Sequence, residues 1–251
     1  DPLGRVAKAR PSDPQAAFVL ANALFEAGRE DEARDYYQKA DALDPTLYPK
    51  LLDQARKLLA SGAADVAEFR LVQAIRLKPQ DAEAHKLLGM VEAQFGKLAE
   101  AVRNLELVTQ LQPTADNHYN FGVVLSLAGQ HGKAIDSYKA AVSLAPDYAP
   151  AANNLAWLLA THPDSSLRNG KEALRLASRN VAAHPEEPGY SGTLDAAFAE
   201  LGRWQEALET VKRTLNLAEK NGNKELAAAA GRRLELYGKH EPYRTTAEGV
   251  K

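Results

Sequence analysis

Apolar residues recur at helical spacing in short segments along most of the chain, and the segments come in pairs. In residues 115–148 the first segment places Phe121 and Leu125 on one side, and the second places Ile135 and Tyr138 on one side. Apolar positions three or four residues apart predict amphipathic helices. A turn that contains glycine separates the two segments. The pattern therefore predicts two short helices packed against each other.

This helix–turn–helix unit repeats, because three residue types keep the same phase along the chain. The alanine that lets each second helix approach its neighbours stands at Ala33, Ala67, Ala101, Ala134, Ala173 and Ala207, at intervals of 34, 34, 33, 39 and 34 residues. The turn glycine stands at Gly28, Gly62, Gly96, Gly129 and Gly202. The proline that ends each second helix stands at Pro45, Pro79, Pro113, Pro146 and Pro185. A unit this small cannot bury its second face alone, so we expect the units to stack.

A 34-residue period of this kind resembles the tetratricopeptide repeat (TPR) family. The Leu-Gly and aromatic pattern that the family shows in its first helices appears as Leu20-Ala21, Leu88-Gly89, Phe121-Gly122 and Leu155-Ala156. Repeat two departs from it with Gln54-Ala55, and no repeat has the family's early tryptophan. The resemblance implies an all-α fold, a right-handed α-solenoid of about six helix–turn–helix repeats with a C-terminal capping helix.

The expected segments follow from these phases. Residues 1–13 have the pattern of the end of a second helix, so we expect a remnant of a preceding repeat there and a natural protein that continues upstream. The six repeats are expected at about 14–47, 48–81, 82–114, 115–148, 149–187 and 188–218. In repeat five, the segment from Thr161 to Gly170 replaces the turn glycine. Two interpretations of this segment stay open: a tolerated loop, or an edge that contacts a partner.

A capping helix is expected at 224–237, followed by a mobile tail at 238–251. Its apolar face consists of Leu226, Ala230, Leu234 and Tyr237, and its other positions include Arg232, Arg233 and Glu235. A terminal repeat needs one apolar face for the stack and one polar face for water.

Composition narrows the function classes. The chain has 31 basic and 33 acidic residues, a net charge of −2, which argues against nucleic acid as a partner. No apolar run reaches the length of a transmembrane segment. The sequence contains no cysteine, so a fold held by disulfides is excluded. The sequence has no phosphate-binding loop and no metal or nucleophile motif, so we expect no cofactor, no metal site and no enzyme activity in this segment. His85 and His118 occupy matching positions in successive repeats, which packing explains without a metal.

The resemblance implies a concave groove lined by the first helices, in which a protein or peptide segment docks. Positions four and seven residues apart along those helices give the candidate groove residues. The apolar groove candidates are Phe18, Phe25, Leu52, Leu59 and Met90. The peptide-groove candidates are Lys86, Tyr119, Asn120, Asn153, Asn154 and Trp157. We expect the apolar part to be covered by the upstream segment, by a second copy of the chain in a homo-oligomer, or by an amphipathic helix of a partner.

Two of these asparagines lead to a specific hypothesis about peptide binding. Asn120 and Asn154 lie one repeat apart, and an amide side chain can donate to and accept from the backbone of an extended peptide. The alternative is that they only satisfy groups of their own helices and loops. The run from Asn153 to Ala156 resembles the NNLA run of kinesin light chain repeats.

The family also contains a chaperone-type clamp for a C-terminal carboxylate. Lys86 and Asn120 match two positions of that clamp, but Met90, Asn153 and Asn154 stand where other residues are required. The match is therefore too poor to place the chain in that class.

Two functions remain. The first is a non-catalytic scaffold or adaptor that binds a protein segment in its groove and links a filament or membrane complex to partners. The second is a substrate-binding or regulatory arm of a larger enzyme whose catalytic part lies upstream.

Overall fold

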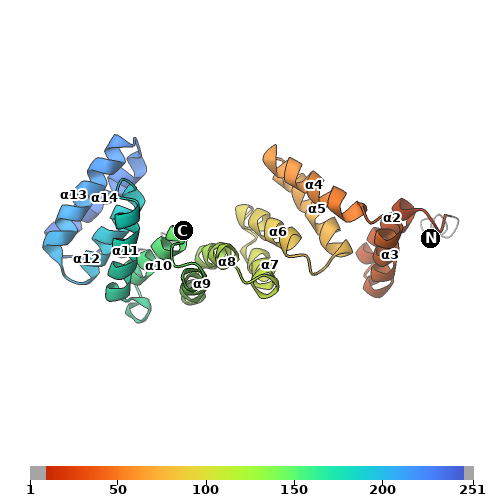
Figure 1. Cartoon of the computed structure of the whole chain (residues 1–251), viewed down its shortest axis with the longest axis horizontal. Helices are drawn as coiled ribbons and strands as arrows, with labels where there is room; N and C mark the ends of the chain where they lie inside the picture. The colour runs from red at the N-terminus through yellow and green to blue at the C-terminus, as the bar shows by residue number, and fades with distance from the viewer. Residues whose placement is uncertain (1–9, 246–251) are drawn as a thin grey trace. The chain divides into compact units, whose positions relative to one another are not determined.

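The computed structural model describes residues 10–245. These residues form α-helices and one short 3-10 helix, and they contain no β-strand (Figure 1). The prediction of an all-α fold is confirmed. The chain divides into two compact units, Asp1–Gln112 and Pro113–Lys251, and each is described by itself.

Within residues 10–112, unit 1 contains three pairs of packed helices. They are α2 (Pro14–Glu26) with α3 (Glu30–Leu43), α4 (Leu47–Ala60) with α5 (Ala64–Leu77), and α6 (Ala82–Gln94) with α7 (Leu98–Leu111). The side chain of Asp13 caps the first of them by accepting hydrogen bonds from two backbone N–H groups of α2. The turns inside the pairs place Gly28, Gly62 and Gly96 at positive φ, which a residue with a Cβ rarely adopts. Alanines 33, 67 and 101 are fully buried where the helices approach each other.

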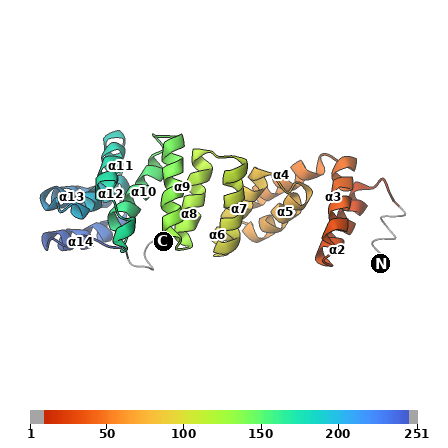
Figure 2. The ribbon, with the colours of Figure 1, turned by 90° about the horizontal axis from the view of Figure 1, so that it is seen from below.

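Within residues 113–245, unit 2 contains three pairs and one further helix (Figure 2). They are α8 (Ala115–Leu127) with α9 (His131–Leu144), α10 (Ala149–Thr161) with α11 (Gly170–Ala183), α12 (Pro188–Glu200) with α13 (Trp204–Lys220), and α14 (Lys224–Gly238). The 3-10 helix η1 (Ser165–Leu167) lies in the long connection after α10. The close packing of α8 on α9 requires a glycine, because a Cβ at Gly122 would lie 2.6 Å from the ring of Tyr138.

Helix α14 packs on α13 and α12 at the end of unit 2. Ala230 and Tyr237 are fully buried, in a core cluster with Ala199, Ala207 and Val211. The sequence predicts Arg233 outside the apolar face of this helix, but the structure buries it to 2 % exposure against Asp195 of α12. Helical periodicity could not reveal a buried charge whose partner lies on another helix.

The chain after α14 also differs from the expectation. The sequence predicts a mobile tail at 238–251, whereas the structure packs residues 243–245 against α10 through hydrogen bonds and a ring contact and against α12 through a hydrogen bond of Arg244. Residues 1–9 and 246–251 lie outside the described residues, and the expected remnant of a preceding repeat falls mostly among them.

Candidate functional site

Helix α10 brings three of the predicted groove residues to one surface of unit 2. Asn153 and Trp157 are four residues apart and so share a helix face, and Asn154 adjoins them. All three are half-buried. On α8, Tyr119 and Asn120 are also half-buried. We call these five residues the first-helix face of unit 2, because α8 and α10 are first helices of their pairs.

Tyrosine rings connect α8 to the helices that follow it. The ring centroid of Tyr119 lies 6.1 Å from that of Tyr138 on α9 and 5.4 Å from that of Tyr148, which precedes α10. Burial and the nearby carboxylate of Asp116 raise the pKa of Tyr148 to about 12. Burial, Glu187 and, to a smaller extent, Tyr119 raise the pKa of Tyr190 on α12. The ring contacts of Tyr119 therefore connect α8 to α9 and to the residue that precedes α10.

Two of the three asparagines of this face, Asn120 and Asn154, have side-chain partners among the described residues. The amide of Asn154 donates a hydrogen bond of 3.4 Å to the hydroxyl of Tyr138, and the amide of Asn120 donates one of 3.2 Å to Asp116. The Oδ1 of Asn153 is buried and has no donor among the described residues. An asparagine amide offers two N–H groups and an acceptor oxygen, so one bond does not exhaust it.

Trp157 contacts one side chain of α14 and one of the segment that follows α14. The guanidinium carbon of Arg233 is 5.8 Å from the centroid of the Trp157 ring, and the ring of Tyr243 is 5.8 Å from it on centroids. A guanidinium close to an indole ring is attracted by the ring's electrons, and two tilted rings at this distance also attract each other. Trp157 is therefore part of a cluster with α14 and the segment that follows it.

That segment binds the last carbonyl groups of α10. The Nη1 of Arg244 donates to Ala160 O at 3.1 Å, and the backbone N–H of Thr245 donates to Thr161 O at 3.0 Å. Carbonyl groups in the last turn of a helix lack partners within the helix, so they are natural acceptors. The side-chain hydroxyl of Thr245 donates to the same Thr161 O at 3.2 Å, and Thr245 is buried.

Glu200, at the end of α12, accepts from two arginines. Its carboxylate accepts from Arg168 Nε at 3.0 Å and from Arg244 Nη2, and its side chain is only 14 % exposed. Arg168 also donates to the carbonyls of His162 and Pro163, at 2.8 and 2.9 Å. Glu200 thereby ties the long connection after α10 to the C-terminal segment. Sequence reasoning missed Glu200, Tyr243 and Arg244, because no repeat position marks them.

The apolar candidates of unit 1 do not form one surface. Phe18 and Leu52 are 4 % and 8 % exposed and belong to the core cluster of the unit, so the prediction that they line an open groove is wrong. The ring of Phe18 packs edge-on against Tyr37 of α3 at 5.9 Å, which is why it turns inward. Leu59 is half-buried against the same core. Phe25 and Met90 are exposed, at 38 % and 49 %.

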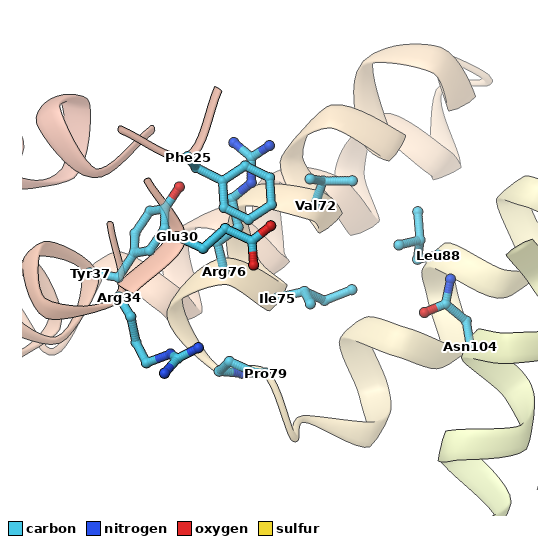
Figure 3. A pocket seen from close by; sticks show the side chains of 10 residues that line it. All are labelled: Phe25, Glu30, Arg34, Tyr37, Val72, Ile75, Arg76, Pro79, Leu88 and Asn104. Carbon is cyan, nitrogen blue, oxygen red and sulfur yellow. The ribbon is translucent and has the colours of Figure 1, made fainter. Parts of the chain in front are cut away.

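Phe25 borders a pocket of about 330 Å³ in unit 1 (Figure 3). Its apolar lining comes from α2, α3, α5 and α6 and from the turn after α5, and consists of Phe25, Tyr37, Val72, Ile75, Pro79 and Leu88. The guanidinium of Arg76 lies 4.0 Å from the centroid of the Phe25 ring and donates to Glu26 at 2.8 Å. Lys86 does not line this pocket, and its Nζ lies 3.2 Å from Glu83 of the same helix.

The side chain of His85 is buried and hydrogen-bonded within unit 1. Its Nδ1 lies 2.7 Å from Asn104 Oδ1 and its Nε2 lies 3.0 Å from Pro79 O, and the ring is buried.

Residues 10–245 contain no group of three or more potential metal ligands. In the same part of the chain, no helix has the length and apolar character needed to cross a bilayer.

Known proteins resemble the chain in sequence and in fold. It is 29% identical over 110 residues to the TPR repeat-containing thioredoxin TTL4 of Arabidopsis thaliana, an alignment of 44% of this chain and only 16% of that protein. The crystal structure of YrrB, a TPR protein with an unusual peptide-binding site, superposes with a TM-score of 0.64 at 19% identity, over 78% of this chain and 97% of the other. MamA from Desulfovibrio magneticus RS-1 superposes with a TM-score of 0.60 at 21% identity, over 69% and 96% of the two chains.

Matches to family models assign the chain to a protein family. Two models described as tetratricopeptide repeat match residues 3–47 and 52–116 and residues 115–148, which together are more than half of the chain. The helix pairs, the turn glycines and the buried alanines agree with that assignment. The chain belongs to the tetratricopeptide repeat family.

Proposed function

We propose that the chain is a non-catalytic scaffold whose first-helix face in unit 2 binds an extended segment of a partner protein. The observation that carries this proposal is the placement of Tyr119, Asn120, Asn153, Asn154 and Trp157, which are all half-buried on two successive first helices. Such a scaffold links a filament or membrane complex to other components. The proposal requires no cofactor and no nucleic acid.

The spacing of packed helices supports an extended ligand. Neighbouring helices pack roughly 8–10 Å apart, and an extended chain covers that distance in about three residues. Asn120 and Asn154 occupy equivalent positions in successive repeats, so one amide could follow the ligand backbone at every third residue or so. Tyr119 and Trp157 combine a large apolar area with a polar group, and such residues concentrate binding energy at interfaces.

The resemblance to YrrB agrees with this proposal, because YrrB is described as a TPR protein with an unusual peptide-binding site. At 19% identity the likeness concerns the fold alone, so the binding residues must come from this chain.

A peptide library tests the proposal without knowledge of the partner. Peptides are selected on the full chain from a random library, and their affinities are measured for the wild type, for Trp157→Ala and for Leu144→Ala. We expect Trp157→Ala to weaken the selected peptides by about 2 kcal/mol or more, as at an interface hot spot. Leu144 is 54 % exposed on α9 and serves as the control, whose replacement should leave affinity unchanged. Peptides that bind all three proteins equally would refute the proposal.

A second function is favoured by one comparison. The relative from Arabidopsis thaliana is a TPR repeat-containing thioredoxin, and the chain spans less than a fifth of it. The chain would then be the substrate-binding or regulatory arm of a larger enzyme. The complete coding sequence tests this alternative, because it shows whether a catalytic domain accompanies the repeats.

A further inference from the structure

The chain's own C-terminal residues occupy one end of the first-helix face. Tyr243 packs on the ring of Trp157, Arg244 binds Ala160 O and Glu200, and Thr245 binds Thr161 O. These three residues have no helical or strand structure. They therefore contact α10 and α12 as a bound peptide would, with an aromatic anchor, a charged anchor and a backbone hydrogen bond.

The surface beneath them has the chemistry of a peptide site. It presents an indole face, a carboxylate that is 14 % exposed, and the carbonyls of the last turn of α10. Arginine suits this arrangement, because its guanidinium can donate to a carbonyl and to a carboxylate at once. The preceding aromatic residue then lies on the indole. A lysine could not reproduce both bonds with the same geometry.

We infer that Trp157, Glu200 and the C-terminal carbonyls of α10 form a binding site for a segment with an aromatic residue followed by arginine. In this structure Tyr243 and Arg244 fill the site and compete with such a partner segment. This inference rests on the proposed function, since it names the partner chemistry for the Trp157 end of the same face.

The two anchor side chains of the segment, Tyr243 and Arg244, are only partly buried, whereas Thr245 is buried. Tyr243 is half-buried, and the side chain of Arg244 is 30 % exposed. The ion pair that holds α14 itself is much more deeply buried, with the side chain of Arg233 3 % exposed and that of Asp195 fully buried. Displacement of the segment does not require this ion pair to break, although it uncovers the buried Thr161–Thr245 contact and the edge of the core cluster on which Tyr243 packs.

The experiment uses the full chain and a labelled synthetic peptide with the sequence of residues 239–251. Its affinity is measured by fluorescence anisotropy for the wild type and for the double variant Tyr243→Ala/Arg244→Ala. A tethered segment competes at an effective concentration of roughly millimolar, so a peptide of about 100 μM affinity should bind the double variant about tenfold more tightly than the wild type. Equal affinity for the two proteins would overturn the inference.

Three controls sharpen the result. A peptide with both the tyrosine and the arginine replaced by alanine should not bind the double variant, and binding by this peptide also overturns the inference. Adding Trp157→Ala to the double variant should abolish binding of the original peptide. Circular dichroism checks that the double variant folds, and Arg244→Ala alone, for which a smaller gain is expected, replaces it if it does not.

The library peptides separate this inference from the proposed function. They are titrated into the same proteins. If they require Trp157 while the 239–251 peptide binds neither the wild type nor the double variant, the proposed function stands and the inference fails. If the library peptides do not depend on Trp157, the proposed function itself fails.

Discussion

Arg233 of α14 donates two hydrogen bonds to Asp195 of α12, at 2.8 and 3.0 Å, and both side chains are buried. Tyr237 and Thr214 donate to the same carboxylate, at 2.9 and 3.1 Å. Burial opposes the charge of Arg233, but Asp195 outweighs it and raises the pKa of the guanidinium. The end of unit 2 is therefore held by a charged network inside an otherwise apolar contact.

Removing one partner of this network should destabilise unit 2. Arg233→Ala leaves the Asp195 carboxylate buried without its counter-charge, which typically costs about 3–5 kcal/mol. The adjacent Arg232 is exposed, so Arg232→Ala is the matched control and should change stability little. Thermal and denaturant unfolding measure both effects. Similar unfolding curves for the two variants would contradict the structural role assigned to Arg233.

The terminal helix should also keep the protein from aggregating. Deletion of residues 224–251 uncovers the apolar surface of α13 that includes Val211, Leu208 and Leu215. Exposed apolar patches of this kind promote self-association. We expect the deleted chain to show larger particles in light scattering, whereas deletion of 246–251 alone should have little effect. The assignment of α14 as a cap fails if both truncations behave alike.

Gly122 and Gly132 provide a paired test of helix packing in unit 2. A Cβ at Gly122 would collide with the Tyr138 ring at 2.6 Å, and overpacking of this kind costs about 1–3 kcal/mol. A Cβ at Gly132, within α9, meets nothing within 4 Å. Alanine is favoured over glycine by about 1 kcal/mol in a helix interior, and by less at Gly132, which is the second residue of α9. Unfolding measurements should therefore show opposite signs for Gly122→Ala and Gly132→Ala, and two losses of equal size would contradict this packing.

The buried carboxyl of Glu92 on α6 should make the stability of unit 1 depend on pH. Burial raises its pKa, while a hydrogen bond donated by Asn104 at 2.7 Å opposes that effect. Because the folded pKa is raised, the contribution of Glu92 to stability is most favourable below its unfolded pKa. It is lost as the pH rises through the folded pKa.

The neutral isostere Glu92→Gln tests this sign. It should melt at a higher temperature than the wild type near pH 7, and the difference should disappear near pH 3, where the wild-type carboxyl is protonated as well. Glu106→Gln, on the exposed side of α7, is the control and should show no such pH-dependent gain. A lower melting temperature for Glu92→Gln at pH 7 would show that the ionised form is stabilised instead.

The sequence predicts the helix pairs well because their signals are short-range. Glycine turns such as Gly62 and small residues such as Ala67 act within one repeat, and their phase repeats. The same periodicity cannot distinguish the inward face of α2 from an open one, because both are apolar. Periodicity therefore predicts Phe18 on a surface, although it packs on Tyr37.

The candidate site in unit 2 can be predicted from the sequence only in part, because some of its contacts do not follow the repeat. Groove positions recur with the repeat, so the sequence predicts Tyr119, Asn153 and Trp157 there, and their role in binding stays a prediction. Arg244 meets Ala160 across 84 residues and Glu200 across 44, and neither contact follows a repeat position. Only a structure reveals such contacts.

The most direct test of the proposed function uses the double variant Asn120→Ala/Asn154→Ala. Its affinity for the selected peptides and its melting temperature are measured together, and the two results decide whether the first-helix face binds a peptide backbone. Among residues 10–245, the side chain of each asparagine makes one hydrogen bond, so the loss of stability should be small. We predict that peptide binding weakens by about 1–3 kcal/mol, as expected for the loss of one or two hydrogen bonds per side chain. A lowered melting temperature with unchanged peptide affinity would contradict the proposed function, because it would show that these asparagines serve the fold alone.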